Sequence, residues 1–218
     1  MSISEGSSSA SDARSGGLEQ LLVRAVDLAP AGLEDFTEMS SPSSDEDPPP
    51  MTGPTPESTA LLNRTFTDKP PREVRTSFVT ADASIVVDEG VSERTAGAAV
   101  TWMADMRQVY AQCPAWTVSA GDQEIPLQVV DPADDPSKPL EVEQRFGDEA
   151  LMRTMLAGSP GQQARITTLL VRQGDRVLEL TFRSLVTEPG SAAETQLHTA
   201  MGKFLALAPA KFLGLPVD

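Results

Sequence analysis

The side chains that most often carry out chemistry in proteins are scarce in this chain. Cys113 is its one cysteine and His198 its one histidine. A Ser-His-Asp or Cys-His mechanism needs a histidine base, so either mechanism would have to use His198. Cys113 falls on the apolar stripe of a predicted helix, which favours a small buried hydrophobic residue over a nucleophile. His198 falls on the opposite face of its helix from Leu197 and Phe204, which favours an ordinary solvent-facing histidine.

Carboxylates form two small groups that could bind a cation or act as an acid and a base. Asp131, Asp134 and Asp135 offer oxygen ligands, but they lack the spacing of an EF-hand loop and its central glycine. Asp148 and Glu149 are adjacent, whereas the two carboxylates of a glycosidase flank a substrate at about 5 to 9.5 Å. We therefore interpret the first group as a solvated loop and Asp148 as part of a turn. We expect no catalytic residue, no metal ligand and no cofactor.

Two other motifs have ordinary structural interpretations. The sequence contains no glycine-rich phosphate-binding loop, and the residues at 158–161 are typical of a connection between strands. Trp102 lies seven residues before Val109 in a predicted helix, which favours packing against a neighbouring element. The alternative is that Trp102 lines a groove.

Two amphipathic helices are the strongest elements that the sequence predicts. The first spans 93–113 and ends before Pro114, and the second spans 192–208 and ends before Pro209. The apolar residues of the first helix fall on one stripe, which comprises Ala96, Ala99, Val100, Met103, Met106, Tyr110 and Cys113. The stripe of the second helix comprises Ala193, Leu197, Ala200, Phe204 and Leu207.

Alternating and β-branched segments predict a mainly antiparallel sheet. The clearest hairpin has Gly174 in its loop and one wet face and one apolar face on its second strand. The segment 149–156 fits a helix as well as a strand, and we interpret it as a strand. The predicted strands are 73–80, 84–89, 116–118, 125–130, 140–146, 149–156, 166–172 and 176–183. We expect an α+β fold in which this mainly antiparallel sheet packs against two long amphipathic helices.

The N-terminal part of the chain is poor in apolar runs. Residues 1–17 have the composition of a disordered tether, and a short helix is predicted at 18–26. The Pro, Ser and acidic residues of 37–56 predict an exposed loop that excludes helix and strand alike. We expect residues 18–213 to form a single domain that includes this loop.

The charge of the chain restricts its partners. A formal net charge of −15 over 218 residues repels a phosphate backbone, so we expect no nucleic-acid partner. No run approaches the roughly 20 apolar residues that span a bilayer, and polar residues rather than a basic and then apolar segment follow Met1. The chain as given is expected to be soluble. It is either cytosolic or the mature part of an exported protein whose signal was removed or lies upstream.

The order of several short motifs along 18–207 resembles a known family. The motifs are Leu18-Glu19-Gln20-Leu21-Leu22, Asp27-Leu28-Ala29-Pro30-Ala31-Gly32-Leu33, Cys113-Pro114, Phe146-Gly147-Asp148-Glu149-Ala150, Val171-Arg172-Gln173-Gly174-Asp175-Arg176-Val177 and a last helix with Lys203. In this order they are similar to the extracytoplasmic sensor-like domains of actinobacterial lipoproteins, which are related to the external domain of PknH-type mycobacterial receptor kinases.

This resemblance implies a non-catalytic domain at the cell surface with a cleft for an unknown ligand. Its partner would be a small molecule or a cell-envelope component, and any membrane tether would lie outside the given chain. Related domains commonly pair a cysteine near 57–62 with the one that ends the long helix, but this chain has only Cys113 and therefore no disulfide. Such a bridge would contribute about 4 kcal/mol in the chain-entropy model.

Two other function classes remain open at this stage. The lone cysteine and the polar start of the chain also fit a cytosolic protein–protein interaction domain. A hydrolase would need a polar constellation in one pocket, for which the candidates are Asp148, Glu149 and His198. The sequence does not identify a ligand or the residues that line a cleft.

Overall fold

The computed structural model describes residues 17–39, 48–135, 137–159, 162–185 and 191–216. Nine strands of these residues form one sheet in the order β1-β3-β4-β9-β8-β7-β6-β5-β2, and neighbouring strands run antiparallel. The strands are β1 Phe36–Met39, β2 Met51–Thr52, β3 Arg72–Thr80, β4 Ile85–Glu93, β5 Ala115–Ala120, β6 Gln123–Val129, β7 Glu149–Ala157, β8 Ala164–Gln173 and β9 Arg176–Leu185. The predicted α+β class with an antiparallel sheet is confirmed.

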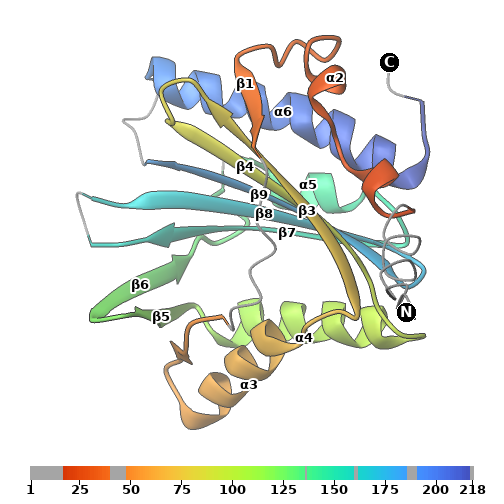
Figure 1. The fold of residues 1–218 in the computed structure, drawn as a ribbon. Helices are drawn as coiled ribbons and strands as arrows, with labels where there is room; N and C mark the ends of the chain where they lie inside the picture. Colours follow the sequence, from red (N-terminus) through yellow and green to blue (C-terminus); the bar gives the residue numbers. More distant parts are fainter. Residues whose placement is uncertain (1–16, 40–47, 136, 160–161, 186–190, 217–218) are drawn as a thin grey trace, which may run out of the picture.

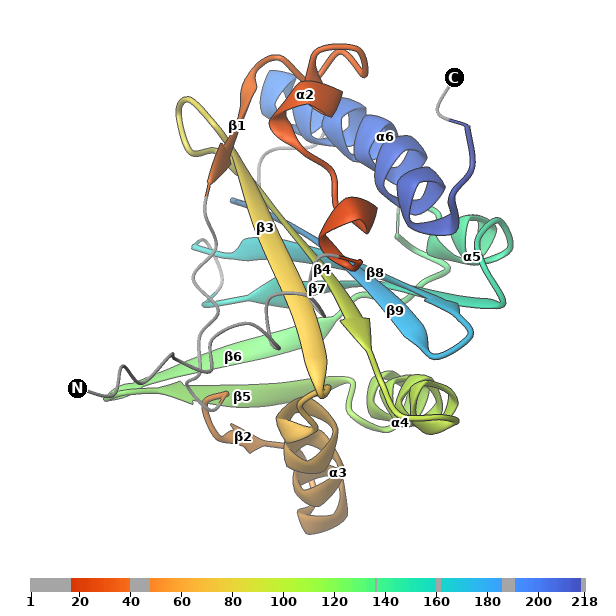
Figure 2. The ribbon, with the colours of Figure 1, turned by 45° about the vertical axis from the view of Figure 1, so that its right-hand side comes forward.

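Helices cover both faces of the sheet (Figure 1). The helix α6, Ala192–Leu213, lies over one face, where the short segments η1, Glu19–Leu21, and α2, Ala25–Leu28, pack beside it (Figure 2). On the other face lie α3, Pro56–Thr67, and α4, Ala98–Gln112. The short helix α5, Pro139–Glu143, precedes β7.

The predicted hairpin is confirmed as β8 and β9. Gln173 pairs with Arg176 at its turn, and Gly174 has a φ of +61°, which glycine adopts without steric cost. Strand β4 then pairs with β9, and β3 pairs with β4. The pair of β3 and β4, which are consecutive in the chain, thus lies beside the distant strand β9 in the sheet.

The main apolar core lies between the sheet and α6. Phe204 is fully buried at its centre, with its ring centroid 5.2 Å from that of Phe36, 5.4 Å from Phe78 and 6.2 Å from Phe182. Because side chains of a strand alternate between the two faces, this core takes every second residue of the central strands. Those of β4 and β9 are Ile85, Val87, Val91, Leu178, Leu180 and Phe182.

A smaller apolar region lies under α3 and α4. Met103 and Val109 of α4 are fully buried there, as is Leu62 of α3. Cys113 is also fully buried, as the sequence predicts, and its Sγ lies 4.0 Å from the carbonyl oxygen of Ser58. Ser58, in the segment 57–62 where the resemblance implies a second cysteine in related domains, thus lies beside Cys113.

The prediction of an exposed loop without secondary structure at 37–56 is wrong for half of its described residues. Strand β1 pairs with β3 at one edge of the sheet, and β2 pairs with β5 at the other. The helix α3 begins at Pro56, where a proline costs nothing because its missing N–H would be unpaired anyway, and Thr55 caps it by accepting a hydrogen bond from Ser58 N. Residues 40–47, and 1–16 of the predicted tether, lie outside the described residues.

Four predicted elements differ from the structure, and the first is the helix predicted at 18–26, which is divided into the 3-10 segment η1 and the short helix α2. The segment 140–146 was predicted as a strand, but α5 occupies its start because Pro139 is a favourable first residue for a helix. Pro209 does not end α6, which continues to Leu213 because Phe212 remains buried in the core and outweighs one missing hydrogen bond. The other long helix begins only at Ala98, since β4 extends to Glu93, and its Val100 is exposed rather than buried.

Candidate functional site

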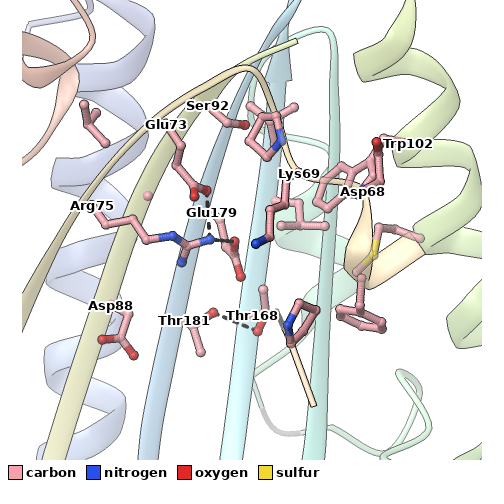
Figure 3. A pocket seen from close by; sticks show the side chains of 18 of the residues that line it. Asp68, Lys69, Glu73, Arg75, Asp88, Ser92, Trp102, Thr168, Glu179 and Thr181 are labelled. Carbon is pink, nitrogen blue, oxygen red and sulfur yellow. Dashed lines mark hydrogen bonds and ion pairs between the residues drawn. The ribbon is translucent and has the colours of Figure 1, made fainter. Parts of the chain in front are cut away.

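An open groove lies on the α3 and α4 side of the sheet, where these helices leave the middle strands uncovered. Its volume is about 1230 Å³, and its floor is formed by β3, β4, β9 and β8. The connection between α3 and β3, with Asp68, Lys69 and Pro70, contributes to its rim. Figure 3 shows charged side chains over β3, β4 and β9 and Trp102 of α4 on the opposite side. The groove is therefore polar on one side and apolar on the other.

A network around Arg75 occupies the polar side. Arg75 of β3 contacts Glu73 at 2.8 Å and Glu179 of β9 at 3.1 Å (Figure 3). Gly90 lies between them in register, opposite both Arg75 and Glu179, and its missing side chain leaves space for the guanidinium to cross β4. Burial lowers the pKa of Arg75, but the two carboxylates outweigh that effect and raise the pKa above its ordinary value.

Hydroxyl and carboxylate groups continue the polar floor. Asp88 of β4 accepts a hydrogen bond from Ser77 Oγ at 2.7 Å and pairs with Arg183 of β9. The hydroxyl oxygens of Thr168 and Thr181 lie 3.0 Å apart across β8 and β9 (Figure 3). The floor thus offers donors and acceptors at fixed positions on paired strands, which is a more rigid support than a loop.

Aromatic side chains form the apolar side. Phe66 of α3, together with Trp102 and Tyr110 of α4, lines the groove, and all three are half-buried. Trp116 packs behind two of them, with ring centroids 6.5 Å from Phe66 and 6.4 Å from Tyr110. Burial raises the pKa of the Tyr110 phenol, so Tyr110 stays neutral at physiological pH. Ile166 completes this side from β8.

Trp102 both packs and lines the groove. Its indole Nε1 donates to the carbonyl oxygen of Thr65 at 3.2 Å, which ties α4 to α3. The guanidinium of Arg94 lies 4.4 Å from the centre of the Trp102 ring and also pairs with Asp68. The burial of Arg94 lowers its pKa, and Asp68 opposes this shift. Packing against a neighbour was the favoured interpretation of Trp102, and the groove was its alternative; the structure shows both.

The charges around the groove are balanced. Five cationic residues line it, namely Arg24, Lys69, Arg75, Arg94 and Arg183. Five carboxylates line it as well, namely Glu19, Asp68, Glu73, Asp88 and Glu179. The groove therefore has no formal net charge, although the whole chain carries −15.

The candidate acid and base residues of the sequence do not come together in this groove. Asp148 and Glu149 form ion pairs with Arg172 at 3.1 and 3.0 Å, at the start of β7. His198 lies in α6 and is half-buried rather than solvent-facing, and its Nε2 has no hydrogen-bond partner among the described residues. None of the three lines this groove or the smaller hollow of about 570 Å³ beside α6 and Lys203.

The three aspartates at 131–135 do not all lie in a solvated loop. Asp135 is 4% exposed, and its Oδ1 accepts hydrogen bonds from the backbone and hydroxyl of Ser137 at 2.9 and 2.7 Å. The exposed Asp131 caps the backbone N–H of Ala133 at 2.9 Å. Within the described ranges, no group of three or more His, Cys, Asp or Glu side chains is arranged to hold a metal ion.

The sequence did not identify the groove residues as a set. The wet face of β9 was recognised, and it supplies Glu179, Thr181 and Arg183. The charges of Arg75 and Asp88 could have shown that β3 and β4 also contribute to the polar surface. Charged residues inside a sheet are unusual unless they face a groove or a partner. Which partners these side chains meet depends on strand register, which the sequence does not specify.

Comparison with known proteins shows a likeness in structure alone. No model of a known protein family matches the sequence, and no curated protein matches it. The extracellular domain of PknH from Mycobacterium tuberculosis superposes with a TM-score of 0.54 at 10% identity, over 89% of this chain and 95% of that one. A putative uncharacterised protein of Mycobacterium smegmatis superposes with a TM-score of 0.44 at 10% identity, over 84% and 94%. The predicted resemblance to the PknH external domain is thus confirmed for the fold.

Proposed function

We propose that this chain is a non-catalytic, extracytoplasmic sensor-like domain that binds its ligand in the groove of β3, β4, β8 and β9. Its ligand would be a small molecule or a cell-envelope component. The domain would comprise residues 18–213, with the antiparallel sheet supported by α4 and α6, and residues 1–17 would tether it. Any membrane anchor would lie outside the given chain, as in a lipoprotein.

The observation that carries this proposal is the Arg75 network on the floor of the groove. Arg75 is held by Glu73 and Glu179 from two strands, and Gly90 leaves the space above β4 that the guanidinium needs. A central strand usually carries apolar or uncharged residues where a helix covers it, so these charges favour an open, functional surface. The sheet holds them before a ligand arrives, which reduces the entropy cost of binding.

Binding rather than turnover is supported by the groups that the groove contains. Its carboxylates are committed to arginines: Glu179 to Arg75 and Asp88 to Arg183. His198 and Cys113, the residues that could serve a nucleophilic mechanism, do not line it. A carboxylate that is held in an ion pair is not free to approach a proton of a substrate, so these groups are poorly placed to act as bases.

A location outside the cytoplasm is supported by the fold alone. The matched domain of PknH is an extracellular domain, and this chain shares its fold over most of both chains. Within the described part of the chain, no helix is long and apolar enough to cross a membrane. A cytosolic interaction domain is the alternative. Protease treatment of intact cells of the native organism distinguishes the two. Digestion of the protein in intact cells supports the proposal, and protection of a soluble protein contradicts it.

The binding site is tested by a fragment screen followed by two-dimensional NMR. We expect the fragments that bind to shift amide signals of β4, β8 and β9 around Gly90. The variant Gly90→Leu fills the floor and should abolish these shifts, because even a Cβ at this position lies 3.4 Å from Arg75. The matched control is Gly202→Leu, at an exposed position of α6 with open space around it. Fragments that bind equally to Gly90→Leu, or that shift only signals elsewhere, contradict the proposed site.

A further inference from the structure

We propose that the groove takes a neutral amphiphile, with a hydroxyl-bearing polar part over Arg75 and Glu179 and an apolar part against Phe66 and Trp102. This inference rests on the proposed function and names the class of ligand for the same site. Three properties of the groove lead to it: its charge balance, the kinds of polar groups on its floor and the aromatic side.

The charge balance disfavours a charged ligand. The groove is lined by equal numbers of cations and carboxylates, and its central cation, Arg75, already contacts Glu73 and Glu179. Both carboxylates contact Nη2 of Arg75, so an anionic ligand at the guanidinium would either lie beside two like charges or displace one of them. A cation would either lie beside Arg75 or displace it from its carboxylates. A group removed from its ion pair in a partly dry site loses much of its stabilisation. A neutral ligand requires neither exchange.

The polar floor suits hydroxyl groups. Arginine donates only, carboxylates accept only, and threonine hydroxyls do both. On this floor the three kinds alternate within a short span, at Arg75, Glu179, Thr168 and Thr181 (Figure 3). A ligand group that donates and accepts at once can satisfy such neighbours without changing their pairing, and a hydroxyl is the smallest neutral group that does so.

The aromatic side requires an apolar part in the same ligand. Phe66, Trp102 and Tyr110 are half-buried and face the groove from α3 and α4, with Ile166 below them. Covering these side chains removes apolar surface from water, which is the main driving force that the groove can supply. A free sugar would leave the aromatic side uncovered. A simple alkane would offer no hydrogen bonds to the polar groups around Arg75.

The test uses n-octyl β-D-glucoside below its micelle concentration, with binding followed by two-dimensional NMR. Three controls separate its parts: glucose has the head alone, octanoate has the chain with a negative head, and octyltrimethylammonium has the chain with a positive head. We expect the glucoside to shift the amide signals of β8, β9 and α4 and to bind at least tenfold more tightly than each control.

Two matched variants test whether the sugar part of the glucoside binds at the threonine pair of the groove. Thr181→Val removes one hydroxyl of the threonine pair in the groove. Thr167→Val does the same for the pair of Thr154 and Thr167, whose hydroxyl oxygens lie 2.9 Å apart on the α6 face of the sheet. We expect Thr181→Val to weaken glucoside binding at least fivefold and Thr167→Val to change it less than twofold, with both variants folded. This difference excludes a general effect of losing a threonine pair.

The outcomes separate the ligand class from the proposed function. Binding of octanoate or octyltrimethylammonium in the groove at equal or higher affinity overturns the neutral class and leaves a binding groove intact. Failure of the glucoside, while fragments still bind around Gly90, overturns the amphiphile and again leaves the groove. If the fragments also bind only outside the groove, both the ligand class and the proposed function are wrong.

Discussion

The two faces of the central sheet come from the same strands and have opposite characters. Towards α6, β4 presents Ile85, Val87 and Val91, and a helix of 22 residues closes the core over them. Towards α3 and α4, the same strand presents Asp88 and Gly90, and the surface stays open. Alternation along a strand assigns each residue to its face, but helix placement decides which face is closed.

Under the proposed function, the two faces divide stability from recognition. Apolar residues on the α6 face can be packed to the density of an interior. On the groove face, the paired strands β3, β4 and β9 hold Arg75 and its partners at fixed positions. Substitutions on the α6 face should therefore change the free energy of unfolding, and substitutions on the groove face should mainly change binding.

The largest expected loss of stability is at Phe204. Three aromatic rings surround this fully buried side chain, so Phe204→Ala should lower the free energy of unfolding by about 3–5 kcal/mol. The groove-facing Thr181→Val should change it by less than about 1 kcal/mol. Urea unfolding followed by circular dichroism measures both. Similar losses in the two variants would contradict the division between the faces.

One carboxylate, Glu89, lies on the apolar face of β4. Glu89 is fully buried, accepts a hydrogen bond from Val23 N at 3.0 Å, and its Oε1 has no partner among the described residues. Burial raises its pKa from 4.5 to about 8, although that hydrogen bond and the nearby Lys211 and Arg24 oppose the shift, while Asp27 adds to it. Folded Glu89 is therefore neutral at pH 7, whereas the unfolded chain releases this proton.

The sign of the pH effect follows from this raised pKa. The contribution of Glu89 to stability is fully present below pH 4.5 and is lost progressively as the pH rises to about 8. We expect Glu89→Gln to remove this loss and to stabilise the protein by about 3 kcal/mol at pH 7 relative to its effect at pH 4. Urea unfolding of both proteins from pH 4 to 9 measures the difference. A difference that does not change with pH would show that Glu89 titrates normally.

A small effect on stability, similar to that of Thr181→Val, is expected at Arg75. Its side chain is 38% exposed, so Arg75→Met should cost about 1 kcal/mol or less, and high salt should reduce that cost. Ligand or fragment binding around Gly90 should be lost in the same variant, because Glu73 and Glu179 are then unpaired. Unfolding at low and high salt, combined with the NMR titration, measures both effects. A loss as large as that of Phe204→Ala would mean that the network supports the fold rather than the ligand.

Local sequence signals predicted the elements whose structure depends on neighbouring residues. Gly174 between two alternating runs predicted the β8 and β9 hairpin, because the short turn of a hairpin needs a residue that tolerates positive φ. Apolar spacing predicted the positions of Met103 and Leu197 on the buried faces of α4 and α6. The alternative at 149–156 could not be decided in this way, and the strand there depends on pairing with β8.

Elements that depend on distant partners were predicted less well. The helix α5 was predicted as a strand, and Pro209 was expected to end α6 although the core on both sides of it keeps that helix continuous. The strands β1 and β2 were missed because an edge strand needs few intrinsic β-formers when a neighbouring strand supplies its partners.

The sequence by itself determined the single cysteine, the charge of −15 and the alternation that divides the strands into a wet and an apolar face. The tertiary structure alone decided which wet residues meet. Arg75 and Glu179 are 104 residues apart, and they join only because β3, β4 and β9 pair in one register across Gly90. Register depends on the sum of many backbone hydrogen bonds and packed side chains, so no local pattern in the sequence contains it.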